Sequence, residues 1–151
     1  KPPARGLKAF ARTYAGWAFS QTFFRKALYK NLGFRTLEDL LQDWEKDHVK
    51  NWDANNLLTK LETWQTNDIS VGTYYNNNFK KALQSIKART IIITCTQDLY
   101  FSSEDNVFEA KNIQNIDLHK YDSPWGHCVA NPGNDSGFKD LLDRSIHELL
   151  N

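Results

Sequence analysis

The sequence has 151 residues, a length typical of one domain. Its 19 Lys and Arg residues against 18 Asp and Glu residues give a net charge of +1, which argues against a nucleic-acid-binding surface and against a polybasic membrane-surface protein. Apolar runs such as residues 91–93 are too short to cross a bilayer, and no signal peptide is recognisable, so we expect a cytoplasmic protein. Methionine is absent even from position 1, so we expect the chain to be part of a longer or processed product.

Residues 1–88 show the periodicity of helices. Polar residues precede the apolar stripes, as N-caps do, and a glycine ends the first helical unit. The expected caps are Ser20, Thr36 (which begins a capping box), Asp53 and, at the C-terminal end of the first unit, Gly33. A polar, turn-rich segment at 67–78 precedes one further short helix. This whole part of the chain is therefore predicted to be helical.

The pattern changes after residue 88. Residues 90–95 are β-branched and apolar without alternation, which is typical of a parallel strand covered on both faces. A helix follows at about 102–111, and a shorter, more polar strand follows at 117–121. A loop then leads to a final amphipathic helix. The order β-α-β-α predicts an α/β fold.

Two strands do not make an independently stable α/β sheet, because the faces and edges of parallel strands must be covered. We therefore expect residues 89–151 to be the last part of a larger sheet. Left alone, the strand at 90–95 would expose an unpaired hydrophobic edge that invites pairing with another chain. We expect the chain to lie against a partner surface, and a swapped homodimer is one way to provide it.

Two residues beyond the ends of these strands are candidates for chemistry. Asp98 follows the first strand, and His127 lies in the loop after the second. Functional groups of open α/β sheets gather beyond the carboxyl ends of the strands, so we expect these two side chains to lie within hydrogen-bonding distance. An Asp that orients a His is two-thirds of a hydrolytic triad, and acid before base is the chain order in α/β hydrolases. Structural roles, as a turn residue and a loop histidine, are the alternative.

The nucleophile of such a triad is missing, because no serine lies in a G-x-S-x-G segment. Cys128 is an alternative nucleophile, since the neighbouring His127 can lower its thiol pKa, although adjacent residues rarely point at the same imidazole. Asp117 and Asp122 are alternative acids, disfavoured because they lie within or beside the strand that leads to His127. Two cysteines supply neither a disulfide framework nor a four-ligand zinc site, so no metal is expected. The remaining histidines are expected at the surface: His48, His119 and His147.

Several stretches of the sequence carry a resemblance to a known family: residues 6–21 (with YAGW at 14–17), 53–58 (DANNLL), 63–70 (TWQTNDIS), 98–101 (DLYF) and 125–127 (WGH). Through them, nearly the whole chain resembles the C-terminal half of α/β-hydrolase proteins of the homoserine O-acetyltransferase type. The resemblance implies that residues 1–88 are a helical lid with its connecting helix. It implies that residues 89–151 are the last two core strands of the fold with their helices.

The same resemblance implies that Asp98 is the triad acid and His127 the triad base. It places the nucleophilic serine and the oxyanion hole on the N-terminal half of the fold, which becomes the expected partner. Aromatic residues of the helical part are candidates to line an acyl pocket beneath the lid, although such residues are more often lid core. The candidates for binding a small-molecule acyl substrate are Tyr14, Trp17 and Trp64.

One departure from the family affects the substrate. In the acetyltransferases the catalytic His is followed by an Asp that helps to hold the amino group of homoserine, whereas here Cys128 follows His127. A thiol cannot replace the charge-assisted hydrogen bonds of a carboxylate, so an ester hydrolase or a transferase for another alcohol is equally supported. No cofactor is expected, and acyl-CoA remains open as a co-substrate. The isolated chain is expected to be inactive, and the competing hypothesis is a non-catalytic interaction module with relic triad residues.

Overall fold

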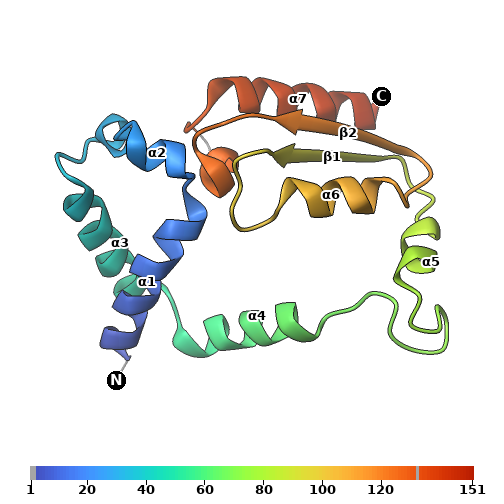
Figure 1. Ribbon diagram of the computed structural model, residues 1–151, viewed down its shortest axis with the longest axis horizontal. Coiled ribbons are helices and arrows are strands. Elements are labelled where there is room, and N and C mark those ends of the chain that lie inside the picture. Colours follow the sequence, from blue (N-terminus) through green and yellow to red (C-terminus); the bar gives the residue numbers. More distant parts are fainter. Residues whose placement is uncertain (1–2, 132) are drawn as a thin grey trace.

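The computed structural model describes residues 3–131 and 133–151. Most elements are helices, and a two-stranded sheet lies at one end of the molecule (Figure 1). In chain order the elements are α1 (Ala4–Ala18), α2 (Gln21–Arg25), η1 (Leu28–Leu32), α3 (Leu37–Asn51), α4 (Ala54–Thr66), α5 (Phe79–Gln84), β1 (Thr90–Cys95), α6 (Ser103–Ala110), β2 (Ile116–Tyr121), η2 (Gly126–Ala130) and α7 (Ser136–Leu150). Among these described elements, no helix is both long and apolar enough to cross a membrane.

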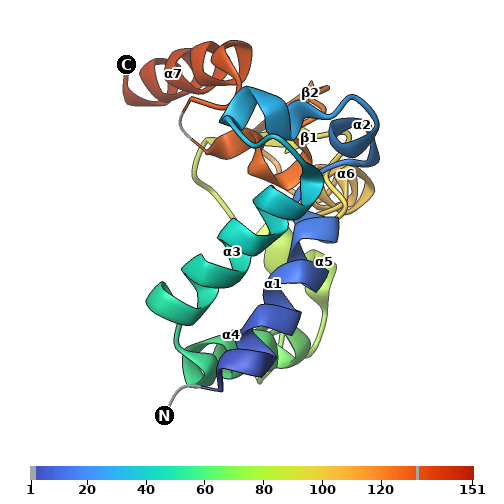
Figure 2. The same cartoon turned by 90° about the vertical axis from the view of Figure 1, so that its left-hand side faces the viewer.

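The sheet consists of β1 and β2, which pair in parallel with Thr90 opposite Ile116 and Cys95 opposite Tyr121. The helix α6 connects the strands, and α6 and α7 flank them on opposite sides (Figures 1 and 2). The predicted β-α-β-α order is confirmed. Residues 90–93 are half-buried, as expected for a strand whose further neighbours are not among these residues. Within the described residues β1 has β2 as its single strand neighbour, so one long edge of β1 is unpaired.

The helices α1 and α3 lie side by side (Figures 1 and 2). Arg12 of α1 joins them, because its guanidinium forms ion pairs with Glu38, at 2.6 Å, and with Glu45 of α3. The predicted caps are confirmed by hydrogen bonds to backbone N–H groups or, for the glycine, by a positive φ angle: Ser20, Thr36, Asp53 and Gly33. The capping box of α3 is closed by Asp39, whose carboxylate accepts from the backbone of Thr36.

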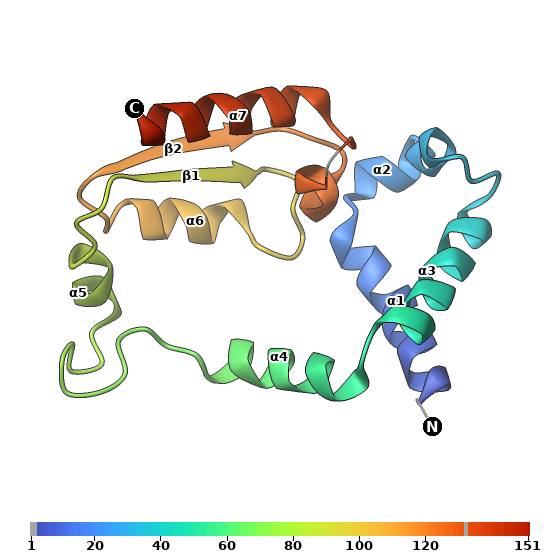
Figure 3. The same ribbon diagram turned by 180° about the vertical axis from the view of Figure 1, so that it is seen from behind.

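The helix α4 runs from the end of the molecule that holds α1 and α3 toward α5 (Figure 3). No residue of α4 is buried by the described chain. Leu58 is 64% exposed, and Leu61 and Trp64 are also exposed although both border a hollow with Tyr100. Part of the apolar surface of α4 is therefore left uncovered by residues 3–131 and 133–151.

A cluster of buried side chains joins the N-terminal helices to the sheet. Its members come from α1, α2, α3, β1, the loop after β2, η2 and α7: Ala18, Phe19, Phe23, Leu40, Cys95, Trp125, Cys128, Val129 and Phe138. The cluster thus contains residues from both sides of the boundary expected at residue 88. Through it, the end of α1 and the beginning of α2 are packed against the loop that carries His127.

The expected surface position of His48 is wrong. The side chain is 3% exposed and lies among the aromatic rings of Phe10, Tyr14, Trp44 and Trp52. The reason is tertiary, because Phe10 and Tyr14 belong to α1, which packs against this face of α3. The other two histidines differ from each other, since His119 on β2 is half-buried and His147 on α7 is exposed as expected.

Candidate active site

Asp98 and His127 lie beyond the carboxyl ends of β1 and β2 and contact each other. His127 Nδ1 lies 3.0 Å from Asp98 Oδ2, a hydrogen-bonding distance. The Asp98 side chain is 11% exposed and that of His127 is 27% exposed, so the pair is shielded and still reachable from solvent. The contact predicted from the sequence is confirmed.

The Asp98 carboxylate is fixed by three donors. While Oδ2 accepts from His127, Oδ1 accepts the backbone N–H groups of Tyr100, at 2.7 Å, and Phe101, at 3.0 Å. Burial is the largest single influence and alone would raise the pKa of Asp98, but the hydrogen bonds from His127 and from the two N–H groups outweigh it. The pKa of Asp98 therefore lies below its ordinary value, and the carboxylate is ionised at neutral pH.

The His127 ring is held in a defined orientation. Asp98 accepts the Nδ1 proton, which leaves Nε2 as the acceptor of the neutral imidazole. The rings of Tyr100 and Phe101 lie edge-on to the imidazole, with centroid distances of 4.8 and 5.2 Å. No described residue is hydrogen-bonded to Nε2. This arrangement presents one ring nitrogen to a reacting group, as a general base requires.

The loop that carries His127 rests on the junction between α1 and α2. The Ser20 hydroxyl donates to the Pro124 carbonyl at 2.5 Å. Gly126 has a φ of +59°, and a Cβ there would lie 2.8 Å from the Ser20 backbone nitrogen and 3.2 Å from the Gln97 oxygen. Glycine is therefore required at position 126, where the loop of His127 meets both the residue before Asp98 and the junction between α1 and α2. The sequence marked Ser20 as a cap, but nothing in it indicated this second contact.

A second anchor lies at the other end of the same loop. The Asp135 carboxylate accepts from the hydroxyls of Tyr121 and Ser123, each at 2.7 Å, and also caps α7 through the N–H of Phe138. Ser123 is fully buried. These bonds tie β2, the loop and α7 together on both sides of His127. Sequence reasoning missed this network, although an Asp directly before a helix is a typical N-cap signal.

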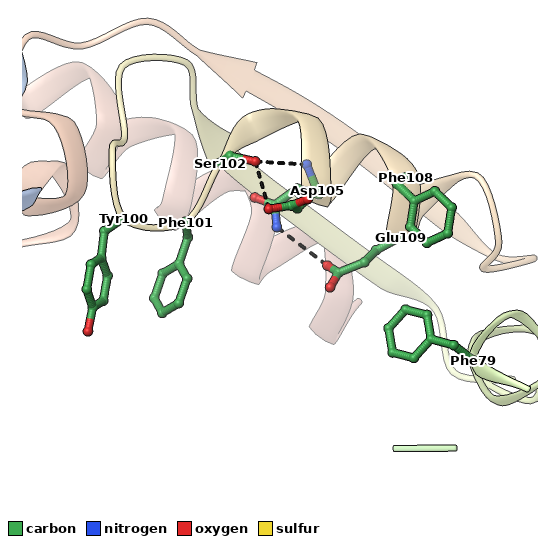
Figure 4. Close-up of a pocket in the computed structure, with 8 residues that line it drawn as sticks. Phe79, Tyr100, Phe101, Ser102, Asp105, Phe108 and Glu109 are labelled. Carbon is green, nitrogen blue, oxygen red and sulfur yellow. Dashed lines mark hydrogen bonds between the residues drawn. The ribbon is translucent and has the colours of Figure 1, made fainter. Parts of the chain in front are cut away.

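Two cavities open beside His127. One, of about 510 Å³, lies toward α3, and the other, of about 280 Å³, runs along β1 and includes Asp98. A further cavity of about 390 Å³ shares Tyr100 and Phe101 with this region and extends along α6 toward Phe79 (Figure 4). The candidate base thus faces hollows that can accept a small molecule.

The structure brings two of the three predicted substrate-binding aromatics to this region. The rings of Tyr14 and Trp64 lie 5.6 and 5.4 Å from that of Tyr100, and all three line one small hollow. Burial raises the pKa of Tyr14 to about 12, so its hydroxyl stays a donor at neutral pH. Trp17 is 54% exposed and lines neither this hollow nor the cavities beside His127. The buried stripe of α1 falls on Leu7, Ala11, Ala15 and Ala18, and position 17 lies off that stripe.

The alternative site residues have other partners. Asp122 accepts hydrogen bonds from Thr96 and Gln97, and Asp117 lies 3.6 Å from Arg89. Cys128 is buried, and burial, reinforced by the charge of Asp98, raises its pKa to about 12, so it is a neutral thiol at neutral pH. The described residues contain no group of three or more His, Cys, Asp and Glu side chains suited to a metal ion.

Comparison with known proteins identifies relatives of this fold. The chain is 33% identical to an ethyl acetate hydrolase of Pseudomonas veronii over 97% of its own length and 41% of that protein. The structure superposes on the acetyl esterase MekB with a TM-score of 0.88 at 33% identity, covering 97% of this chain and 42% of that one. It superposes on an acetylester hydrolase from Corynebacterium glutamicum with a TM-score of 0.87 at 25% identity, covering 97% and 41%. No protein-family model matches the sequence.

A homoserine O-acetyltransferase of Haemophilus influenzae is also similar, at 32% identity over 60% of this chain and 26% of that protein. The chain therefore has the fold of a portion of an α/β hydrolase, and it is homologous to acetyl esterases of the homoserine O-acetyltransferase-like superfamily. The chain spans about two-fifths of the length of these esterases.

Proposed function

We propose that the chain supplies the acid and the base of a serine-dependent acyl-transfer site that hydrolyses small acetyl esters. The hydrogen bond between Asp98 and His127 carries this proposal. The ethyl acetate hydrolase and a probable esterase of Corynebacterium glutamicum match 97% and 82% of this chain, whereas the Haemophilus influenzae acetyltransferase matches 60%, which favours water over homoserine as the acyl acceptor. Cys128 after His127 supports the same choice, because it offers no carboxylate to an amino group.

In this proposal the nucleophilic serine and the oxyanion hole come from a segment outside these 151 residues. That segment is the N-terminal half of the same fold, on the same or another polypeptide. A swapped second copy is the alternative way to cover the edge of β1, although it brings no such serine. The unpaired edge of β1 and the exposed apolar part of α4 are the surfaces that the N-terminal half would cover. Residues 1–88 would then form the helical lid over the site.

The chemistry follows from the states of the two side chains. His127 Nε2 accepts the proton of the serine hydroxyl while the serine oxygen attacks the ester carbonyl. The imidazolium that forms is stabilised by the Asp98 carboxylate, and it then gives its proton to the departing alcohol. Water repeats the sequence on the acetyl-enzyme, with His127 as base again, and releases acetate.

The test uses the whole polypeptide that carries this chain, with ethyl acetate as substrate. We expect Asp98→Asn and His127→Ala each to lower kcat by about 10⁴-fold, as loss of a triad member does. Asp122→Asn is the matched control, since Asp122 lies near the same loops but is bonded to Thr96 and Gln97, and we expect full activity from it. Activity of Asp98→Asn equal to that of Asp122→Asn would instead support the non-catalytic interaction module.

A further inference from the structure

The loop between β2 and η2 contains a buried hydroxyl that holds the backbone beside His127. Ser123 is fully buried, and its hydroxyl donates a hydrogen bond of 2.7 Å to the Asp135 carboxylate, directly before α7. The Ser123 side-chain oxygen also accepts the backbone N–H of Trp125 at 3.3 Å, and the Ser123 carbonyl oxygen accepts that of Gly126 at 3.2 Å. Ser123 therefore binds the two residues that directly precede His127.

Asp135 is suited to hold this hydroxyl because its carboxylate is ionised. Burial is the largest single influence and alone would raise the pKa of Asp135, but hydrogen bonds from Ser123, Tyr121 and two backbone N–H groups outweigh it and lower the pKa below its ordinary value. A charged acceptor makes a stronger hydrogen bond than a neutral one. The two oxygens have different partners, since Oδ2 accepts from Ser123 whereas Oδ1 accepts from Tyr121 and the N–H of Phe138. The loop of His127 thus has an acceptor oxygen of its own.

The backbone on the other side of His127 is held from the same segment. The side-chain amide of Asn134 donates to the carbonyl oxygen of Cys128 at 2.8 Å. Within residues 3–131 and 133–151, the imidazole of His127 has one hydrogen-bond partner, Asp98, at 3.0 Å. Hydrogen bonds weaken steeply when their distance and angle change, so the contact with Asp98 depends on where the loop backbone lies.

We propose that Ser123 and Asp135 are positioning residues of the proposed triad, and that their hydrogen bond places the loop so that His127 meets Asp98 and presents Nε2. The kinetic part of this inference rests on the proposed function, whereas the orientation of His127 can be tested without it. Neither Ser123 nor Asp135 lines the cavities beside His127. Loss of their bond should therefore lower kcat and leave KM nearly unchanged.

The test compares two hydroxyls that donate to the same carboxylate. Ser123→Ala removes the hydrogen bond from the loop, and Tyr121→Phe is the matched control, since it removes a bond of the same length from β2. In the whole polypeptide with ethyl acetate as substrate, we expect Ser123→Ala to lower kcat by about 10- to 100-fold while KM changes by less than about twofold. We expect Tyr121→Phe to keep kcat within about twofold of the wild type, although both variants should melt at a lower temperature.

The Nδ1 proton of His127 gives a second readout that needs no turnover. Its ¹H NMR resonance is visible while the hydrogen bond to Asp98 protects the proton from exchange with water, and its absence from His127→Ala assigns it. We expect the resonance in the wild type and in Tyr121→Phe, and we expect Ser123→Ala to lose it. A general loss of stability would not separate these two variants.

Asp135→Asn takes the place of Ser123→Ala if that variant does not fold. Asparagine keeps one acceptor oxygen for the cap of α7 and offers an amide in place of the oxygen that accepts from Ser123, so we expect the same direction of change. A kcat or a resonance retained in the variant without the Ser123 bond, or an equal loss of kcat in Tyr121→Phe, would overturn the inference. If the wild type does not hydrolyse ethyl acetate, the proposed function fails, and the resonance alone decides the positioning role. A wild type without the resonance would overturn that role as well.

Discussion

The Ser20 hydroxyl donates a hydrogen bond of 2.5 Å to the carbonyl oxygen of Pro124, a residue 104 positions later in the chain. Ser20 Oγ also accepts the backbone N–H of Phe23 at 3.0 Å and so caps α2. One buried side chain therefore begins a helix and fixes the loop of His127. Its removal should affect both.

We expect Ser20→Ala to lower the free energy of unfolding by about 2–4 kcal/mol, because it removes an N-cap and leaves the Pro124 carbonyl without its donor. Thr36→Ala is the control, since Thr36 caps α3 at an exposed position and its hydroxyl donates no hydrogen bond to a distant loop. We expect Thr36→Ala to lower the free energy of unfolding by about 1 kcal/mol. Urea unfolding measures both. Equal losses would show that the contact with Pro124 contributes nothing.

Gly126→Ala should be more disruptive than alanine at another glycine of positive φ. At Gly126 the new methyl group would lie 2.8 Å from the Ser20 nitrogen, in addition to the backbone strain of φ +59°. At Gly33 the φ is +89° and nothing lies within 4 Å of the new carbon. We expect a loss of about 1–2 kcal/mol for Gly33→Ala from strain and a further loss of about 1–3 kcal/mol for Gly126→Ala from overpacking. Similar melting curves for the two variants would contradict the close approach seen at Gly126.

The two cysteines should be unreactive in the folded protein. Cys95 and Cys128 are both buried, and burial raises the pKa of each thiol, that of Cys128 to about 12. We expect the mass of the native protein to be unchanged after brief treatment with iodoacetamide at pH 8, and two adducts to appear after denaturation. Rapid modification of Cys128 in the native state would revive it as a nucleophile beside His127.

Stability should fall in acid in a manner that depends on Asp98. The pKa of Asp98 in the folded protein is below its value in the unfolded chain, about 3.9. The ionised carboxylate therefore stabilises the fold fully above that unfolded value, and the contribution is lost as the pH falls through the lower, folded pKa. Between about pH 5 and pH 2 the free energy of unfolding should decline less steeply for Asp98→Asn than for the wild type. Parallel curves would mean that Asp98 does not gain its hydrogen bonds on folding.

Local signals in the sequence predicted most of the helices and both strands. The capping box of Thr36 and the N-cap of Asp53 placed the beginnings of α3 and α4, because a cap acts on backbone groups two or three residues away. The contact of Asp98 with His127 was also predictable, since parallel strands bring their carboxyl ends to one edge of the sheet. These features depend on neighbours in sequence or on the regular geometry of a sheet.

The features that the sequence did not predict depend on distant contacts. His48 is buried because Phe10 and Tyr14 reach it from another helix, and no pattern within α3 shows this. The short helix η2 replaces part of the expected loop, and its start requires the positive φ of Gly126 against Ser20. Trp17 has the spacing of an apolar helix face, but the buried face of α1 runs through Ala11, Ala15 and Ala18, and Trp17 is exposed. In each case tertiary packing decides between local alternatives.

The connection of β1 to β2 through α6 has a consequence for the order in which the chain folds. Asp98 and His127 are 29 residues apart, whereas Ser20 and Pro124 are 104 apart. Loop-closure entropy rises with the logarithm of loop length, so the longer closure is less favourable by about 1 kcal/mol. The strand–helix–strand unit can therefore nucleate early and assemble the acid and base from near neighbours, and the docking of α1 and α2 onto the loop of His127 is the later, long-range event.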